Sequence, residues 1–270
     1  MPSEIFNALN KEGQFTKEML GAGATQIRKA NYATKGIYFQ AFTSLSTGLE
    51  RIGKLCLMLD HYIENQKFPD INYVKNDIGH DILKLYDKSK EVVNSRDANF
   101  DFLSNLDGDI HLSMMRILSE FATSDRYSNI NLVVGARRQG DPIAAWYAGV
   151  DALLYKTRVS AKRKNTIQRN ASVISALLSK HTFVRHTSES GDEITDIEDA
   201  STRTGFVEAV APYRQLYVLQ IIRYWVELLT SLQDIAMKKG SHDIPFFSEV
   251  FAPFYNKDSY IRTRKTWDKI

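Results

Sequence analysis

The chain has 270 residues, 43% of them apolar and 25% charged, a composition typical of a globular protein that buries a full core. The formal charge of +3 is too small to indicate a nucleic-acid protein by itself, so such an inference depends on where the charges lie. A single cysteine excludes an intramolecular disulfide and a cysteine-based zinc site, and it fits a reducing compartment. Because the start lacks an apolar signal-peptide core and no long uninterrupted apolar stretch follows, we expect a cytoplasmic protein with no membrane partner.

The first two expected helices run from about residue 16 to 34 and from 38 to 63. Gly21 and Gly23 should weaken the first helix, because glycine costs roughly 1 kcal/mol relative to alanine in a helix interior. The second has apolar residues at alternating spacings of four and three, which predicts the central helix of a bundle. This stripe consists of Tyr38, Phe42, Leu45, Leu49, Ile52, Cys56, Leu59 and Ile63.

A third helix is expected to begin near Val74 and to end at the polar run 94–99. Its inner side carries Ile78, Ile82, Leu85 and Val92. Asp109 is the expected N-cap of a fourth helix. That helix carries Ile110, Met114, Ile117 and Phe121 on its inner side. Asp107, Asp109 and His111 could together ligate a metal, but a turn followed by a helix cap explains the two aspartates without one.

The second half of the chain is also expected to be helical. Asp141 before Pro142 is a helix start signal, because proline fits the first turn, where no N–H donor is needed; a break follows near Ser160. Residues 188–204 are acidic and have little to bury, which predicts a mobile surface loop better than a calcium site. The last long helix is expected after Gly205. Its polar residues, which exclude a membrane span, are Arg214, Gln220, Arg223 and Glu227.

These patterns contain no internal repeat and no run of alternating strands, so they predict an all-α protein. We expect a helical bundle over residues 1–135 and a C-terminal helical region over residues 136–270, which includes the basic segment and the acidic loop. The sequence leaves open whether the two regions form one continuous domain.

The stretch KNDIGH places Lys75, Asn76 and His80 near the start of the third expected helix. At about 100° per residue, His80 points away from the inner stripe and toward Lys84 and Asp87. It is therefore expected on the surface and not in the core. Such a histidine either has no role or faces a cleft or a partner subunit.

The same stretch resembles the motif of the HEPN superfamily, helical-bundle proteins that include toxin and antiviral ribonucleases. In that motif an arginine is followed by a polar residue and, a few residues further along, by a histidine; Lys75, Asn76 and His80 stand at these positions. The stretch LERIGKL, residues 49–55, is also similar to these bundles, and the resemblance covers residues 34–130. It implies an HEPN-like antiparallel helical bundle with additional C-terminal helices, metal-independent RNA cleavage by His80, and a homodimer with the motif at a shared cleft.

Metal-independent cleavage uses the ribose 2′-hydroxyl as nucleophile, so it requires a proton acceptor and a cation that faces the phosphate. Histidine suits the first task and a basic side chain the second. Because lysine lacks the bidentate fork of arginine, Lys75 leaves open whether the chain cuts RNA or only binds it. Arg126, past the fourth expected helix, is the candidate for the missing guanidinium. No cofactor and no metal are expected, and Glu50 with Lys54 is expected to be a structural ion pair.

Positive charge is concentrated between residues 137 and 169, where eight basic residues stand against Asp141 and Asp151 for a net charge of +6. Such segments bind the phosphates of nucleic acid. The expected RNA-binding residues are Arg137, Arg138, Arg158, Lys162, Arg163, Lys164 and Arg169. A second basic group with interleaved aromatic residues consists of Arg262, Arg264, Lys265 and Lys269. The alternative is a solvated helix face and a fraying tail.

The sequence thus favours an RNA-binding, HEPN-like protein whose catalytic form would be a metal-independent endoribonuclease in a toxin or anti-phage defence role. The defence role rests on the analogy alone. The alternative function is that of a non-enzymatic helical assembly protein that dimerises and binds an acidic partner. A homodimer is expected because Leu83 and Tyr86 offer apolar surface beside His80, unless the C-terminal helices of the same chain cover them. No particular protein partner can be inferred.

Overall fold

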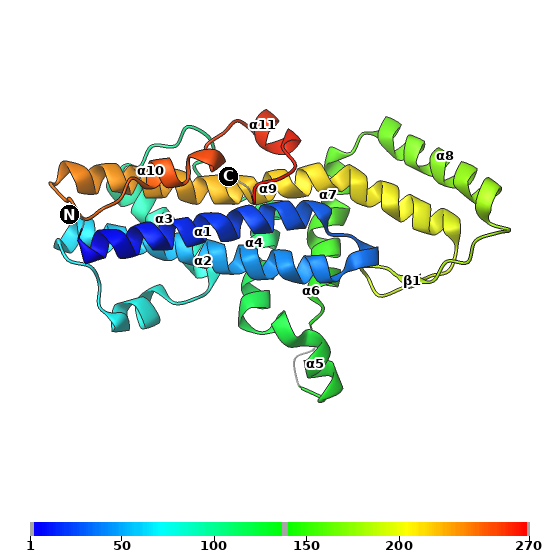
Figure 1. The fold of residues 1–270 in the computed structure, drawn as a ribbon, viewed down its shortest axis with the longest axis horizontal. Helices are drawn as coiled ribbons and strands as arrows, with labels where there is room; N and C mark the ends of the chain where they lie inside the picture. The colour runs from blue at the N-terminus through cyan, green and yellow to red at the C-terminus, as the bar shows by residue number, and fades with distance from the viewer. Residues whose placement is uncertain (1–2, 137–139, 269–270) are drawn as a thin grey trace.

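The computed structural model describes residues 3–136 and 140–268 and confirms the all-α class (Figure 1). The helices are α1 (Glu4–Lys29), α2 (Gly36–Asn65), α3 (Ile82–Arg96), α4 (Asp109–Thr123), α5 (Ser128–Val133), α6 (Pro142–Trp146), α7 (Ala152–Arg158), α8 (Ala161–Leu178), α9 (Ile197–Lys238), α10 (Phe247–Val250) and α11 (Asp258–Thr263). Shorter helical turns are η1 (Tyr32–Thr34), η2 (Tyr73–Ile78), η3 (Asp125–Tyr127), η4 (Tyr147–Asp151) and η5 (Ala252–Phe254). Strands β1 (His186–Thr187) and β2 (Glu193–Ile194) form one antiparallel pair.

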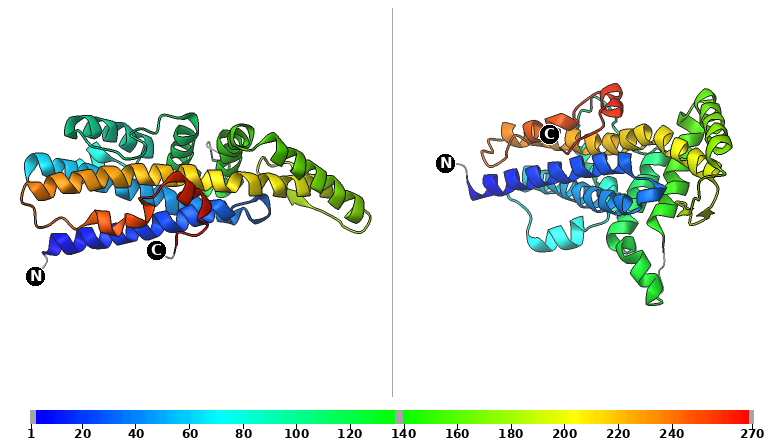
Figure 2. Two further views of the ribbon diagram at one scale, coloured as in Figure 1. Left: turned by 90° about the horizontal axis from the view of Figure 1, so that it is seen from above. Right: turned by 45° about the vertical axis from the view of Figure 1, so that its right-hand side comes forward.

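Three long helices, α1, α2 and α9, form the body of the molecule, and α1 runs antiparallel to α2 (Figure 1). The 42-residue helix α9 extends along nearly the whole length of the molecule. Seen from above in Figure 2, α3 lies on one side of α9 and α1 on the other. Helix α8 and the two strands lie at the end remote from the N-terminus, and the segment with α10 and α11 returns along α9 and α1. One cluster of buried apolar residues joins residues of both expected regions, from Leu20 to Trp267.

The two glycines of α1 are points of close contact. A Cβ atom at Gly23 would lie 2.6 Å from the Leu45 side chain of α2, and one at Gly21 would collide with the carbonyl oxygen of Trp267. The Trp267 N–H donates to Thr25 Oγ1 at 2.7 Å, and the indole ring is fully buried. The C-terminal segment therefore packs on α1 up to Trp267 instead of fraying, and α1 is a full 26-residue helix because tertiary contacts outweigh the propensity cost of glycine.

The third helix does not begin near Val74 as expected. The π-helical turn η2 ends at Ile78, Gly79 takes a φ of +75°, and α3 starts at Ile82 with Asp81 as its N-cap. The cap carboxylate accepts two backbone N–H bonds, at 2.9 and 3.2 Å. The expectation was wrong because the apolar spacing continues across this break, while a glycine and a capping aspartate interrupt the helix. His80 consequently lies in a connector and not on a helix face.

The segment 188–204 is not the mobile loop that its acidity predicts. Asp196 caps α9, which starts at Ile197, by accepting backbone N–H bonds at 2.8 and 3.0 Å. Glu189 is only 2% exposed, and the neighbouring Ser188 carbonyl accepts a hydrogen bond from Lys35 Nζ at 2.7 Å. Acidic residues near a helix N-terminus cap the helix and interact favourably with its dipole, so the acidic residues of this segment indicate a helix start.

Other helix starts are closer to expectation. Asp141 accepts two backbone N–H bonds at the start of α6, with Pro142 in the first turn, as predicted. The predicted break near Ser160 is also confirmed, because Ser160 caps α8. At α4 the prediction was wrong by one residue: Gly108 is the N-cap and Asp109 the first helical residue. None of the helices in the described chain is long and apolar enough to span a membrane.

Arg214 of α9 connects the helices at the centre of the molecule. Its guanidinium pairs with Asp151 at 2.9 and 2.6 Å, and both side chains are almost fully buried. It also donates to the carbonyl oxygens of Ile27 and Ala30, at 3.0 and 2.8 Å, and to the Tyr38 hydroxyl at 3.2 Å. The carbonyl groups at the end of α1 are thereby satisfied by a buried charge pair, which fixes α9 and η4 against that helix.

Candidate nucleic-acid interface

His80 contacts two residues of α2. Its Nδ1 lies 2.8 Å from Glu50 Oε1, and Lys54 Nζ lies 2.8 Å from the same oxygen and 3.2 Å from Nδ1. We assign the Nδ1 hydrogen to the bond with Glu50, which leaves Nε2 toward solvent in a side chain that is 65% exposed. Burial alone would raise the pKa of Glu50. Hydrogen bonds from Lys54 and His80 outweigh burial, so the pKa of Glu50 lies below its ordinary value. The expected Glu50–Lys54 ion pair is confirmed, and it also orients the imidazole.

The other residues of the expected catalytic group lie apart from these contacts. Lys75 and Asn76 are exposed on η2, and the Arg126 guanidinium lies over the Phe121 ring, 6.0 Å from its centroid. Within residues 3–136 and 140–268, no hydrogen bond or ion pair joins any of the three to His80. The grouping of these four residues in one catalytic site therefore stays a prediction.

The possible metal ligands around the start of α4 have other partners. Burial lowers the pKa of His111, whose Nε2 lies 2.9 Å from Gln220 Oε1. Asp107 accepts a hydrogen bond from the Tyr86 hydroxyl at 3.0 Å. In the described part of the chain, no group of three histidine, cysteine or acidic side chains is placed to hold a metal.

The apolar surface expected beside His80 is only partly present. Tyr86 is 1% exposed, accepts the Leu106 N–H at 2.6 Å, and packs edge-on against Tyr224 of α9. Leu83 is half-buried against the same core. The expectation for Tyr86 was wrong because α9 of the same chain covers the ring. The homodimer therefore remains a prediction that rests on the resemblance and on Leu83.

The residues of the predicted basic segment have different surroundings. Arg137 and Arg138 lie outside the described residues. On α8, Lys162 and Arg169 are exposed, while Lys164 is half-buried with its ammonium 5.0 Å from the centroid of an aromatic ring of α7. Their grouping in one RNA-binding surface therefore stays a prediction.

Arg158 and Arg163 line a groove beside the N-terminal half of α9. The groove consists of two adjoining hollows, of about 290 and 380 Å³, which share Arg158, Tyr213 and Arg262. The first hollow is also lined by Leu216, Tyr217, Gln220, Asp258 and Ser259, and the second by Val159, Ser160, Arg163, Glu208, Ala209 and Pro212. We call this surface the α9 groove. It combines two residues of the basic segment with Arg262 of the second basic group.

Two arginines of the α9 groove, Arg158 and Arg262, lie against tyrosine rings. The Arg158 guanidinium donates through Nε to the Tyr217 hydroxyl at 3.0 Å and lies 5.4 Å from the ring centroid. The Arg262 guanidinium carbon lies 5.9 Å from the centroid of Tyr213. In the described chain the Arg262 guanidinium donates no hydrogen bond, so its donors are available to a ligand. The cation–π contact with Tyr213 holds the Arg262 guanidinium in place without using its N–H groups, whereas Arg158 donates through both Nε and Nη2 to the Tyr217 hydroxyl.

The groove also reaches the N-terminus of α8. Ser160 caps this helix by accepting the Arg163 N–H at 3.3 Å. The Arg163 guanidinium is 3.7 Å from Glu208, and both side chains are about half exposed or more, so this ion pair contributes little to stability. The partial positive charge of a helix N-terminus adds to that of the nearby arginines.

Hydrogen bonds fix two of the polar side chains that line the groove, Gln220 and Asp258. Gln220 bridges His111, at 2.9 Å, and Asp258, whose Oδ2 accepts its Nε2 hydrogen at 2.9 Å. Asp258 also pairs with Arg223 at 2.8 Å, so its negative charge is already compensated. Among the described residues that line the groove, Glu208 is the one carboxylate with only a weak ion pair, so the three arginines give the groove a net positive charge.

Comparisons of the chain with protein-family models, curated proteins and solved structures find no match. The HEPN resemblance accordingly stays an expectation, and the fold and groove define the chain only as an all-α protein with a cationic, tyrosine-lined surface. Sequence patterns alone did not indicate Tyr213 and Tyr217 as residues of a binding site. Their i, i+4 spacing was a usable signal, but the approach of α7 and α11 was not visible in the sequence.

Proposed function

We propose that the chain binds single-stranded RNA in the α9 groove. The observation that carries this proposal is the convergence around Tyr213 of Arg158 and Arg163, which are close in sequence, with Arg262 from the distant C-terminal segment. Guanidinium groups bind phosphate oxygens bidentately, and a tyrosine ring offers a face on which a base can stack. A base can reach such a ring only when it is unpaired, which favours a single strand over a duplex.

Exposed charges beside the groove support a longer contact with the RNA backbone. Lys162 and Arg169 are exposed on α8, whose N-terminus borders the groove at Ser160. A strand that leaves the groove along α8 would meet these two cations in turn. Phosphate contacts of this kind supply most of the sequence-independent affinity for nucleic acid.

RNA cleavage has weaker geometric support than RNA binding. Glu50 orients the His80 ring and leaves Nε2 facing solvent, as a proton acceptor requires. In the described chain, however, the cation in contact with His80 is Lys54, and no arginine contacts it. Cleavage therefore remains a prediction, and RNA binding is the part of the function that the groove supports.

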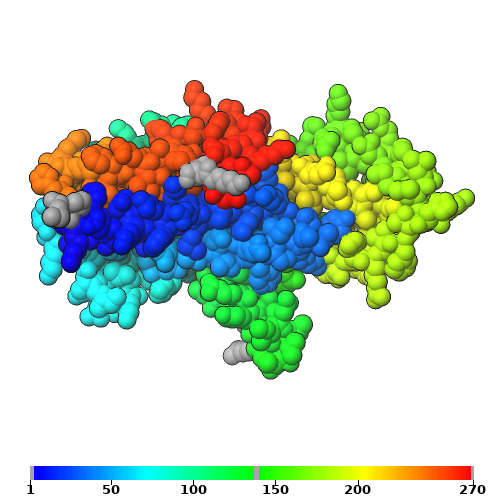
Figure 3. Space-filling model, viewed as in Figure 1, coloured from blue at the N-terminus to red at the C-terminus, as the bar shows by residue number. Residues whose placement is uncertain are grey.

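A second candidate function is assembly with a protein partner, favoured by the surface of α5. This helix projects from the body of the molecule (Figure 3). On and just after it, more than half of each apolar side chain is exposed at Ile130, Leu132, Val133 and Val134. Exposed apolar surface of this kind commonly marks an interface. A protein with this function alone would have no arginine-dependent affinity for RNA, so an RNA titration separates the two candidates.

The test is a fluorescence anisotropy titration of a labelled oligouridylate with the wild type and the Arg158→Ala/Arg262→Ala variant. Each lost charge-assisted contact costs about 1 kcal/mol or more, so the double variant should bind at least about tenfold more weakly. Arg116→Ala, which removes an exposed arginine of α4 outside the groove, is the matched control and should bind like the wild type. Equal affinity of the double variant and the wild type, or an equal loss in the control, would contradict the proposal. The single variant Arg262→Ala serves if the double variant unfolds.

A further inference from the structure

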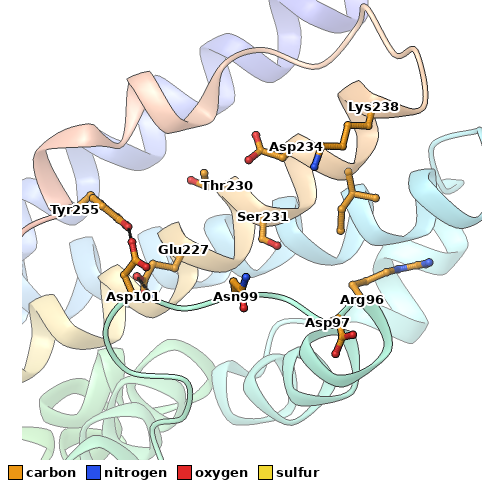
Figure 4. Close-up of a pocket in the computed structure, with 11 residues that line it drawn as sticks. Arg96, Asp97, Asn99, Asp101, Glu227, Thr230, Ser231, Asp234, Lys238 and Tyr255 are labelled. Carbon is orange, nitrogen blue, oxygen red and sulfur yellow. Dashed lines mark hydrogen bonds between the residues drawn. The ribbon is translucent and has the colours of Figure 1, made fainter.

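A second cleft opens further along α9, beside the loop that follows α3 (Figure 4). It has a volume of about 390 Å³. Four carboxylates line it, Asp97, Asp101, Glu227 and Asp234. Thr230, Ser231 and Tyr255 add hydroxyl groups, and Asn99 adds an amide. Figure 4 shows Glu227 beside Asp101 at one end of the cleft and Asp97 with Arg96 at the other.

Glu227 is the unusual member of this group. It is only 4% exposed, and its Oε1 accepts the backbone N–H of Asp101 at 3.0 Å. Its second oxygen, Oε2, is buried and has no hydrogen-bond partner in the described chain. Leaving a buried acceptor unpaired costs roughly 1–3 kcal/mol, so most such groups in proteins have a partner. A ligand with N–H donors would supply that partner.

The cations around the cleft do not neutralise its carboxylates. Arg96 donates to Asp60 at 2.7 Å and to Glu64 at 2.9 Å, both outside the cleft. Arg223, the arginine nearest in sequence to Glu227, is paired with Asp258. Lys238 is then the one cation lining the cleft that makes no ion pair within residues 3–136 and 140–268.

The carboxylates of the cleft accept few hydrogen bonds from the other described residues that line it. Tyr255 donates its hydroxyl hydrogen to Asp101, which leaves Asp97 and Asp234 without a hydrogen bond from the other residues that line the cleft. Asp234 does accept one bond, from Gln233 Nε2 at 3.2 Å, outside the cleft. The described side chains do not provide a metal site here. The surplus of negative charge therefore fits an organic cation.

We propose that this cleft binds a linear aliphatic polyamine. One ammonium group would donate to Glu227 Oε2, and a second would pair with Asp97 at the other end of the cleft or with Asp234 further along α9. An ammonium group has three donors and no acceptor, which matches a lining of carboxylate and hydroxyl oxygens. The methylene chain between the ammonium groups would pack on Ile235 and on the aliphatic stem of Lys238. This site is independent of RNA binding in the α9 groove.

Isothermal titration calorimetry with spermidine at pH 8, above the pKa of about 7 to which burial raises Glu227, tests the proposal on protein freed of nucleic acid. The wild type should show saturable binding, and Glu227→Gln should weaken it at least about tenfold, because the glutamine amide retains an acceptor for the Asp101 N–H but removes the charge. Glu91→Gln, which neutralises an exposed glutamate of α3 outside the cleft, is the matched control and should leave the affinity unchanged.

A neutral analogue of similar length, 1,8-octanediol, should not bind, because it carries no positive charge. Equal affinity of spermidine for the wild type and Glu227→Gln would overturn the proposal, and so would the absence of saturable binding to the wild type. If Glu227→Gln does not fold, the Asp97→Asn/Asp234→Asn variant, which removes both candidate partners of the second ammonium group, provides the same comparison. Normal RNA affinity with no spermidine binding would remove the polyamine site and leave the α9 groove unaffected.

Discussion

Replacing Glu227 by glutamine should remove a pH-dependent cost of folding. Burial raises the pKa of Glu227 from an ordinary value of 4.5 to about 7, against lowering contributions from the backbone N–H of Asp101 and from Arg223. Because the pKa is higher in the folded state, the neutral carboxyl favours folding. Its contribution is fully present below about pH 4.5 and is lost as the pH rises through about 7.

The size of this effect follows from the difference between the two pKa values. At about 1.4 kcal/mol for each pKa unit, the wild type should lose up to about 3 kcal/mol of unfolding free energy between acid and pH 8. Glutamine at this position carries no charge and keeps an oxygen that can accept the Asp101 N–H. The Glu227→Gln variant should therefore not show this loss.

Urea unfolding of the wild type and Glu227→Gln, measured at intervals from pH 5 to 8.5, tests this reasoning. The unfolding free energy of the variant, relative to that of the wild type, should increase by about 1–3 kcal/mol across this range. All other titrating groups are common to both proteins and largely cancel in the difference. The same comparison with Glu91→Gln should be flat. A difference between Glu227→Gln and wild type that does not change with pH would show that the buried carboxyl is not neutral at pH 6.

Two further predictions concern the packing of α9 and the C-terminal segment. Gly21→Ala should lower the unfolding free energy by about 1–3 kcal/mol and increase the solvent exposure of Trp267, measured by fluorescence quenching, because the added methyl group displaces a backbone carbonyl; unchanged quenching would contradict the contact. Asp151→Asn should cost about 3–5 kcal/mol in urea unfolding, because it leaves the buried Arg214 guanidinium without its counter-charge; a loss below about 1 kcal/mol would refute that role.

Local sequence patterns predicted the elements whose structure depends on local spacing. Every residue of the stripe from Tyr38 to Ile63 is almost fully buried in α2, because a helix that is apolar at these spacings has one face to cover. The apolar spacing led to a wrong prediction at Gly79 and Asp81, because the spacing continues there although the backbone turns and the helix is interrupted. The prediction of a mobile loop over residues 188–204 was also wrong, because Asp196 caps helix α9 and is not simply a solvated charge.

Contacts between distant segments could not be predicted, and the candidate sites depend on them. Arg158 and Arg163 were named from the local charge density, but only the fold places Arg262 beside them. In the same way, the contact of His80 with Glu50 depends on how the connector before α3 lies against α2. These placements depend on packing over the whole chain, which the periodicity and composition of the sequence do not describe.

Photo-crosslinking of single-stranded RNA that contains 4-thiouridine, followed by identification of the crosslinked peptides, tests the central claim most directly. RNA binding in the α9 groove predicts crosslinks to the peptide with Tyr213 and Tyr217, and their loss in the Arg158→Ala/Arg262→Ala variant. Crosslinks confined to the peptide with Lys75 and His80, with none in the groove, would contradict the proposed interface.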